Sequence, residues 1–469
     1  MAEDPDNSLD AALKEVAERA STYLRDIRQR RVAPTEEAVS RLQQIKIAFP
    51  EHAASAAEII QLLDDFGSPA SVANAGGRYF GFVNGGTLTP ALAAAWLVSA
   101  WDQNAGMSVS SPGASFFEEQ ALQWVMETLA LPRESGGAVV TGATSSNFVC
   151  LCAARHELLR RAGWNVEADG LFGAPPINVV VSDEVHTSML KALSLSGFGR
   201  SRLHRVPTDD QGRMRVVHLP ELDGNTLLCI QAGNVNSGAF DPALELCERA
   251  RCAGAWVHVD GAFGLWAKAS GKYSHLTRGC EMADSWSVDG HKWPNVGYDC
   301  GIAIVRNAEA LRAAMMFSAA YLQTSTQRDA SHYGPEMSRR ARGVELWAAL
   351  RGLGKRGLAE LIERTCQLAQ RFARGLTASG FQVLNEVVIN QVMVSFGSSD
   401  MTRQVISELQ REGTCWCGGT EWHGHTAMRI SVSSWVTTEA DVDISLDAIQ
   451  RVACGLARAP LRSEPLLKF

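Results

Sequence analysis

The feature that most constrains the fold is an alternation of two patterns between about residues 115 and 306. Helix-like stretches alternate there with short apolar runs rich in β-branched residues. These runs lie at residues 138–140, 178–181, 226–230, 256–259, 286–288 and 301–305. Such an order is typical of a mostly parallel sheet flanked by helices on both faces, so we predict an α/β fold.

The segments on either side of this region show other patterns. In residues 8–65, apolar residues recur at spacings of three and four, which predicts helices. After Arg340, a helical stretch is followed by alternating segments at 383–396 and 427–433, which predict strands. We therefore expect an N-terminal helical segment, a large domain and a smaller C-terminal α/β domain, at residues 1–85, 86–340 and 341–469.

Charge and composition limit the partners that this chain can have. Its 469 residues carry a formal net charge of −7 without long Lys/Arg blocks, which argues against binding to nucleic acid or to anionic membranes. The longest nearly apolar run, Pro90 to Trp101, is shorter than a membrane span, and the N-terminus is too acidic and polar for a secretory signal. Eleven cysteines are too sparse for a disulfide framework, so we expect a cytoplasmic protein.

Polar residues follow five of the expected strands, at the edge where open parallel sheets bind their ligands. These segments are Thr141 to Asn147, Ser182 to Thr187, Gln231 to Asn236, Asp260 to Phe263 and Asp289 to Trp293. Each segment alone has a simpler interpretation, such as a helix cap, a structural histidine or a polar turn. Lys292 stands out, because it is one of only eight lysines and lies between His291 and Trp293 although lysines prefer water.

Taken together, the five segments indicate one kind of chemistry. Small hydroxyl residues at a helix N-terminus suit a phosphate group. A lysine amine can form a Schiff base with an aldehyde, and a carboxylate can keep a pyridine nitrogen protonated so that the ring accepts electrons. An imidazole can stack on that ring. This set of groups predicts a site for pyridoxal 5'-phosphate.

Three of these runs resemble motifs of a known family. The runs Ser285 to Trp293 (SWSVDGHKW), His258 to Ala262 (HVDGA) and Ser182 to His186 (SDEVH) resemble the group II pyridoxal phosphate-dependent amino-acid decarboxylases. That group includes the aromatic-amino-acid, histidine and glutamate decarboxylases. The resemblance extends over about residues 70–350. It implies a type I PLP-dependent transferase fold, a small amino-acid substrate, and a homodimer with active sites at the subunit interface.

The resemblance also implies roles for individual residues. Lys292 would be the Schiff-base lysine, and His186 would stack on the ring. His291 would lie beside the phosphate and the substrate carboxylate, and Tyr321 would protonate the substrate α-carbon from a lid loop. The residues expected to bind the cofactor are Lys292, Asp260, Ala262, His186, Thr144, Ser145, Asn234, Asn236 and His291.

The sequence departs from the family at one position near the lysine. The family usually has Asn-Pro before His-Lys, whereas this chain has Asp289 and Gly290. A carboxylate is unfavourable beside a phosphate unless it points away or is neutralised. Whether Asp289 contacts the cofactor phosphate is therefore left open.

The expected reaction is decarboxylation of an L-amino acid to the amine and CO₂, and the expected substrate is aromatic. Tyr79, Phe80 and Phe82 would supply aromatic surface. A polar or acidic amino acid is the alternative substrate class, because Asn104 and Gly106 occupy positions where aromatic decarboxylases have bulky apolar residues, and Asp102 and Gln103 beside them are polar. The run from Trp101 to Asn104 could equally form a helix end without substrate contact.

The sequence gives less support to two other functions and to a metal site. Oxidative aldehyde synthases on this scaffold are associated with Phe in place of the loop tyrosine, so Tyr321 favours a decarboxylase. A catalytically inactive scaffold would not need Lys292, Asp260 and His186 together. Two cysteines and two histidines, Cys415, Cys417, His423 and His425, are spaced too tightly for a typical zinc site, so we expect no metal.

Overall fold

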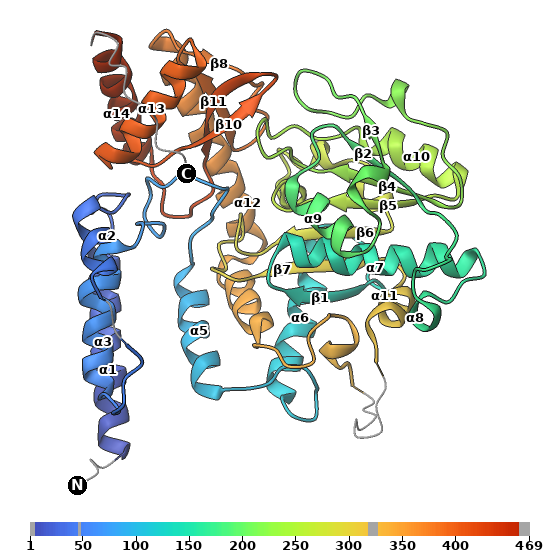
Figure 1. Cartoon of the computed structure of the whole chain (residues 1–469), viewed down its shortest axis with the longest axis horizontal. Coiled ribbons are helices and arrows are strands. Elements are labelled where there is room, and N and C mark those ends of the chain that lie inside the picture. Colours follow the sequence, from blue (N-terminus) through green and yellow to red (C-terminus); the bar gives the residue numbers. More distant parts are fainter. Residues whose placement is uncertain (1–4, 46–47, 318–326, 459–469) are drawn as a thin grey trace.

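The protein is described by a computed structural model that covers residues 5–45, 48–317 and 327–458. Its larger part is built on a seven-stranded sheet (Figure 1). In spatial order the strands are β1 (Gly136–Val140), β7 (Gly301–Val305), β6 (Ser285–Asp289), β5 (Trp256–Asp260), β4 (Thr226–Gln231), β2 (Asn178–Ser182) and β3 (Leu203–Val206). Only β7 runs antiparallel to its neighbours, so the predicted mostly parallel sheet is confirmed.

All six expected strands are present, and β3 is the additional one. It lies at the edge of the sheet, where it pairs only with β2. Its middle residues, His204 and Arg205, are exposed. An edge strand with polar exposed residues does not show the apolar run that identifies a buried strand, which explains why the pattern missed it.

Helices cover both faces of this sheet (Figure 1). One face packs against α7 (Ala143–Arg161), α9 (Thr187–Leu195) and α11 (Ala308–Met315). The other packs against α6 (Pro112–Thr128), α10 (Ala243–Ala253) and the first half of α12 (Arg342–Ala378). Successive strand residues alternate between the two cores, as Trp256 and Val257 of β5 do. The short helix α8 (Val166–Asp169) follows α7.

A second, antiparallel sheet forms the C-terminal part. Its strands, in spatial order, are β10 (Gly418–Trp422), β11 (His425–Ser431), β9 (Gln391–Ser395) and β8 (Gln382–Val383). The expected strand at 383–396 is therefore two strands with a loop between them. Helices α13 (Ser399–Glu412), α14 (Glu439–Arg458) and the second half of α12 cover this sheet. Since α12 packs on both sheets, the domain boundary near residue 340 stays a prediction.

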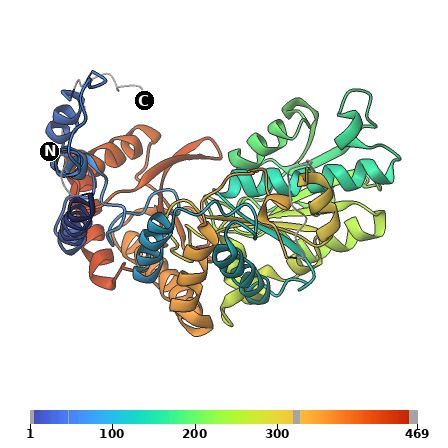
Figure 2. The same cartoon turned by 90° about the horizontal axis from the view of Figure 1, so that it is seen from below.

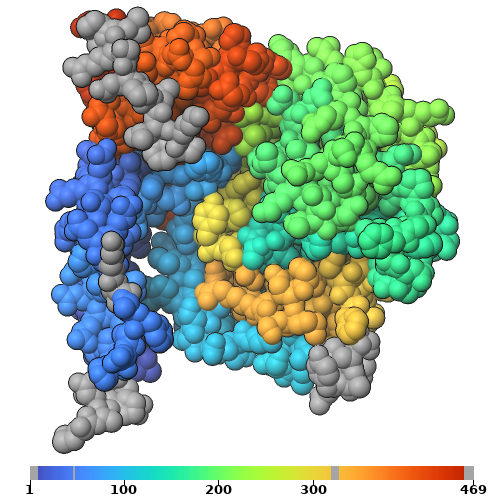
Figure 3. All heavy atoms as spheres, in the orientation of Figure 1, coloured from blue at the N-terminus to red at the C-terminus, as the bar shows by residue number. Residues whose placement is uncertain are grey.

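The predicted N-terminal helices are α1 (Pro5–Asp26), α2 (Glu36–Gln43) and α3 (Ala56–Leu62). After a π-helical turn at Leu63–Gly67, the short α4 (Ser68–Ala70) and then α5 (Thr89–Trp101) lead into the larger part. The first three helices stand beside the rest of the molecule, on the same side as the C-terminal sheet (Figures 2 and 3). A cavity of about 740 Å³ separates α1 from α5.

Two expected absences concern metals and membranes. Within the described residues, no group of three or more His, Cys, Asp or Glu side chains could hold a metal ion. Cys415 and Cys417 are buried where the chain enters β10, and His423 lies in the turn between β10 and β11. In the same residue ranges no helix is both long and apolar enough to cross a membrane.

Candidate active site

Lys292 lies in a loop that begins where β6 ends, and buried side chains fix this loop in place. The Trp293 indole is fully buried and donates a hydrogen bond to Thr365 Oγ1 of α12 at 2.8 Å. The Asn295 amide donates to the carbonyl oxygens of Trp293 and Ser433, at 2.6 and 3.0 Å. A Cβ atom at Gly85 would lie 1.8 Å from the Lys292 carbonyl oxygen, so only glycine fits there. Both sheets and the segment before α5 thus position the lysine.

The amino group of Lys292 has an acidic partner. Lys292 Nζ lies 3.2 Å from Asp289 Oδ2, and His291 Nε2 lies 3.6 Å from the same oxygen. The Asp289 side chain is 1% exposed, and no described residue forms a hydrogen bond with its Oδ1. A Cβ atom at Gly142 would lie 3.7 Å from that Oδ1 and 3.1 Å from His291 Cε1. The loop before α7 therefore meets the lysine loop directly at Asp289 and His291.

The loop before α7 has the form expected of an anion site. Thr144 and Ser145 lie in the first turn of this 19-residue helix, and both are half-buried. The hydroxyl groups of Thr141 and Ser145 share a hydrogen bond of 2.8 Å. Gly142 is the N-cap of this helix, so the first N–H groups, which lack intrahelical partners, and the positive end of the helix dipole lie next to it. This arrangement can bind a phosphate group.

Asp260 and His186 reach the site from neighbouring strand ends. Asp260 ends β5, and its two carboxylate oxygens accept hydrogen bonds from Ala262 N at 3.2 Å and from Asn147 Nδ2 at 3.3 Å. His186 caps α9, where its Nδ1 accepts from Ser188 N at 3.2 Å. Burial lowers the pKa of His186, and the nearby Asp260 carboxylate acts in the opposite direction. A largely uncharged ring thus lies in the field of Asp260 and Lys292.

Two of the expected cofactor ligands have other partners. Asn234 Oδ1 closes a turn by accepting hydrogen bonds from the backbone of Asn236 at 2.8 Å and Ser237 at 3.2 Å. Asn236 Oδ1 connects the two sheets, because it accepts from Thr420 Oγ1 at 2.9 Å and Arg429 Nη1 at 3.3 Å. Their role in cofactor binding stays a prediction. Tyr321, the expected proton donor, lies outside the described residues.

The arrangement of a lysine, a buried carboxylate and an anion site at one sheet edge matches a known family. The sequence profile of the pyridoxal-dependent decarboxylase conserved domain matches residues 40–397, most of the chain. The chain belongs to this family. The resemblance predicted from the motifs is confirmed, and the cofactor of the family is pyridoxal phosphate.

Individual members of the family resemble this decarboxylase at moderate identity. Tryptophan decarboxylase 1 of Oryza sativa subsp. japonica is 27% identical over 415 residues, which cover 80% of each chain. The aromatic-L-amino-acid decarboxylase of Bos taurus is 25% identical over 95% of this chain and 96% of its own. A phenylacetaldehyde synthase of Arabidopsis thaliana is 26% identical over 74% and 76%.

Solved structures confirm the fold of the decarboxylase. Oryza sativa TDC with PLP and tryptamine superimposes with a TM-score of 0.89 at 23% identity, over 97% of this chain and 99% of that one. Mouse CSAD superimposes with a TM-score of 0.87 at 20% identity, over 96% and 99%. The predicted type I PLP-dependent fold is therefore confirmed.

The sequence motifs missed a basic residue that faces the site of the decarboxylase. Arg429 of β11 is largely buried, and no acidic side chain among the described residues forms an ion pair with it. Burial lowers its pKa, and its charge acts on both His186 and Tyr79. Because β11 belongs to the C-terminal sheet, no motif around Lys292 could have indicated this residue.

Two of the three expected aromatic residues pack on Trp416, and one of them, Tyr79, lies within the field of Arg429. Tyr79 stacks on Trp416 with ring centroids 5.0 Å apart, and burial raises the pKa of Tyr79 to about 12. Phe82 packs on the same indole at 5.4 Å and is 62% exposed. The expectation for Phe80 is wrong, because this ring is buried in the core of the C-terminal part against Phe372. Phe80 therefore cannot line a substrate pocket.

The polar segment after α5 forms a helix end in this chain. Asp102 caps α5 in the left-handed conformation, with a φ of 46°. Asn104 Oδ1 accepts hydrogen bonds from Gly106 N at 3.2 Å and Arg339 N at 3.0 Å. The Gln103 amide donates to the Trp101 carbonyl oxygen at 2.9 Å. These contacts support the simpler interpretation, in which the segment closes a loop.

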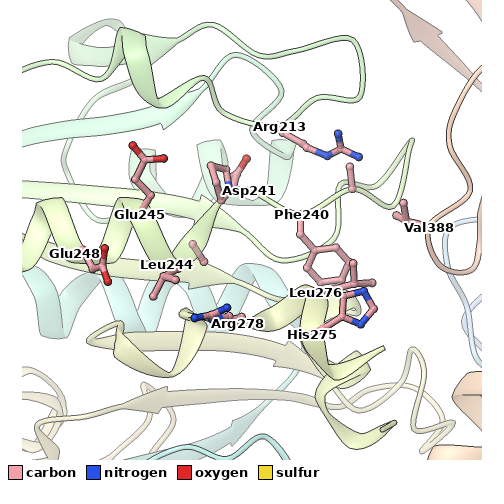
Figure 4. A pocket seen from close by; sticks show the side chains of 13 residues that line it. Arg213, Phe240, Asp241, Leu244, Glu245, Glu248, His275, Leu276, Arg278 and Val388 are labelled. Carbon is pink, nitrogen blue, oxygen red and sulfur yellow. The ribbon is translucent and has the colours of Figure 1, made fainter. Parts of the chain in front are cut away.

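The decarboxylase has another cavity, which does not belong to this site. It has a volume of about 370 Å³ and is lined by Arg213, Asp241, His275 and Arg278 among others (Figure 4). Arg213 is paired there with Asp209 and Glu386, and both Asp241 oxygens accept backbone hydrogen bonds. None of the predicted site residues lines this cavity.

His258 gives the protein a testable pH dependence. This ring is fully buried, and burial lowers its pKa from 6.5 to about 4 against the effect of Asp260. Below pH 6.5 the unfolded chain gains a proton at His258 that the folded protein does not take up, so stability falls with pH down to about 4. We expect a loss of about 3 kcal/mol from this residue.

The measurement is urea unfolding between pH 7 and pH 4 for the wild type and for His258→Gln, which cannot titrate. All other residues are the same in both proteins, so the difference between the two curves isolates His258. Parallel curves would contradict the assignment of a neutral, buried imidazole.

Proposed function

We propose that the protein decarboxylates an aromatic L-amino acid to the amine and CO₂ at the site around Lys292. The observation that carries this proposal is the position of Lys292 Nζ, 3.2 Å from a buried carboxylate and beside the N-terminus of α7. When bound, pyridoxal 5'-phosphate supplies an aldehyde for a lysine amine and a ring that accepts the electrons left behind by departing CO₂.

Each residue of the site would have its own role once the cofactor is bound. Lys292 would bind the aldehyde, and Asp260 would accept a hydrogen bond from the pyridine nitrogen. Thr144, Ser145 and the first N–H groups of α7 would hold the phosphate. His186 and Ala262 would pack against the ring, and His291 would serve the phosphate and the substrate carboxylate. Tyr321 would deliver the proton to the α-carbon.

The groups around Arg429 support an aromatic substrate. Its buried guanidinium, without an acidic partner among the described residues, can pair with the carboxylate of an amino acid. Tyr79, on which the Arg429 charge acts, and the exposed Phe82 ring both pack on Trp416 and offer flat apolar surface.

A product screen tests this function. Purified holoenzyme is supplied separately with tryptophan, tyrosine, 3,4-dihydroxyphenylalanine, phenylalanine and glutamate, and CO₂, amine, aldehyde and peroxide are measured. We expect CO₂ and amine in equal amounts from an aromatic substrate. Turnover of glutamate alone would contradict the proposed substrate class, and aldehyde with peroxide would instead indicate an oxidative synthase.

Asp289 allows a prediction about the phosphate. Its carboxylate lies next to Gly142 at the anion site and pairs with Lys292, so it would repel a bound phosphate. We expect Asp289→Asn to bind pyridoxal 5'-phosphate about tenfold more tightly. Titration of the apoenzyme with this compound and with pyridoxal, which has no phosphate, gives two dissociation constants. The gain should be confined to the phosphorylated compound, and an equal gain for both would contradict the prediction.

The exposed apolar residues support a homodimer. On α1, Leu9 and Leu13 are 60% and 56% exposed, and on α5, Trp96 and Leu97 are 43% and 53% exposed. A second copy that covers these helices would remove this apolar surface from water. Sedimentation equilibrium should give twice the mass of the chain.

A cytoplasmic location remains a prediction. Its support is that all eleven cysteines are free thiols.

A further inference from the structure

Three residues of β5 share one face of the sheet. Trp256, His258 and Asp260 alternate with Val257 and Val259, so all three point toward α7 while the valines point to the opposite core. All three polar or amphipathic side chains are at most 6% exposed. Asp260 alone belongs to the proposed cofactor site. The burial of Trp256 and His258 behind Asp260 is therefore not explained by direct contact with the cofactor.

A chain of hydrogen bonds connects these residues. Trp256 Nε1 donates to Ser285 Oγ at 3.0 Å, and Ser285 Oγ lies 2.9 Å from His258 Nδ1. His258 Nε2 lies 2.9 Å from Asn147 Oδ1, and Asn147 Nδ2 donates to Asp260 Oδ2 at 3.3 Å. Ser285 is the register partner of His258 on β6, and Asn147 belongs to the first turns of α7.

The two ends of this chain fix its direction. The Trp256 indole can only donate, so the Ser285 hydroxyl accepts from it and gives its own proton to His258 Nδ1. The imidazole is uncharged, because burial lowers the pKa of His258 to about 4. Its single N–H is therefore on Nε2, and this group donates a hydrogen bond to Asn147 Oδ1. The Asn147 amide must then present its NH₂ group to Asp260, whose carboxylate can only accept.

We infer that Asn147 and His258 are positioning residues that hold Asp260 as an acceptor aimed at the pyridine nitrogen of the cofactor. This inference rests on the proposed function, in which Asp260 meets that nitrogen. Asn147 and Ser285 are fully buried, so water cannot replace a missing link of the chain. Loss of one link leaves the Asn147 amide free to turn, or removes it. Asp260 Oδ2 then loses its side-chain donor, and only the Ala262 N–H still donates to Oδ1.

The test compares two ligands that differ in one atom. The apoenzyme is titrated with pyridoxal 5'-phosphate and with its 1-deaza analogue, which has carbon in place of the ring nitrogen. Asn147→Leu and His258→Leu should weaken binding of the natural compound about tenfold and leave binding of the analogue unchanged. His258→Gln should restore the wild-type ratio, because a glutamine can accept from Ser285 and donate to Asn147.

Ser146→Ala is the matched control. Ser146 lies next to Asn147 on the same helix, is equally buried and forms a hydrogen bond with Ser287 instead. It should leave the ratio of the two dissociation constants unchanged. If Asn147→Leu does not fold, Trp256→Phe tests the chain of hydrogen bonds from its other end. This variant should also weaken binding of pyridoxal 5'-phosphate relative to binding of its 1-deaza analogue.

The outcomes separate this inference from the proposed function. If the two leucine variants weaken binding of both ligands equally, Asn147 and His258 have a structural role only and the inference is overturned. If these variants weaken binding of neither ligand, the inference is overturned as well. If the wild type does not prefer the natural compound over the analogue, the assignment of Asp260 itself is wrong, and the inference fails with it.

Discussion

Lys292→Ala is expected to reduce decarboxylation by at least about a thousandfold and to abolish the visible absorbance of the bound cofactor. In the proposed function this amine is the group that binds the cofactor aldehyde, and no other lysine is held by the loop after β6. The measurement is CO₂ release from an aromatic amino acid, together with the absorbance spectrum of the reconstituted protein.

The variant also removes the partner of a buried carboxylate, so its effect on folding must be separated from its effect on catalysis. Asp289 would be left uncompensated, which destabilises folded proteins by about 3 kcal/mol. The double variant Lys292→Ala/Asp289→Asn removes both charges and should be folded but inactive. Lys268→Ala is the control, because this lysine pairs with Glu281 at 3.7 Å, away from the site. Activity in the folded double variant would contradict the role of Lys292.

Asp260→Asn is expected to lower kcat by about 100- to 1000-fold. Asparagine keeps the shape and the burial of the side chain but carries no negative charge to stabilise a protonated pyridine nitrogen. The loss should appear in kcat rather than in the KM for the amino acid, because Asp260 acts on the electrons of the reaction and not on the substrate. Steady-state kinetics with saturating cofactor measure both constants.

Two comparisons decide how the Asp260 result is interpreted. Asp260→Glu retains the charge and should recover part of the lost rate, whereas Asp260→Ala should be at least as slow as Asp260→Asn. A loss smaller than about tenfold in Asp260→Asn, with full cofactor occupancy, would contradict the proposed contact.

The pattern of apolar runs predicted the central sheet well because its strands are buried on both faces. The strand expected at 301–305 is β7 with the same bounds, and the other five differ at their ends by one or two residues. The pattern failed where burial is incomplete or where the chain turns back on itself. Edge strand β3 was missed for the first reason, and the loop between β8 and β9 for the second.

The candidate site was predictable as far as its residues follow strand ends in the sequence. Lys292, Asp260, His186 and the start of α7 come together because parallel strands place their carboxyl ends at one edge. Arg429 and Trp416 were not predictable in this way, since they reach the site from the C-terminal part. Phe80 was assigned wrongly because its aromatic neighbours, Tyr79 and Phe82, lie on the other side of the same segment.

The alternation of residues in β5 predicts which side chains lie next to Asp260 on the same face of the sheet. Residues two apart in a strand face the same side, so Trp256 and His258 had to lie behind Asp260. The pattern alone could not supply Asn147 or Ser285, because these contacts depend on how α7 and β6 pack against β5. The hydrogen-bond chain therefore became visible only in the structure.

The most direct test of the central claim is to locate the cofactor on the chain. Reduction of the holoenzyme with borohydride makes the bond between the cofactor and its lysine permanent, and peptide mass spectrometry then identifies the modified residue. We predict one pyridoxyl group per chain, on Lys292. A group on Lys268 or Lys272 instead, or no modified lysine in a protein that still releases CO₂, would contradict the account.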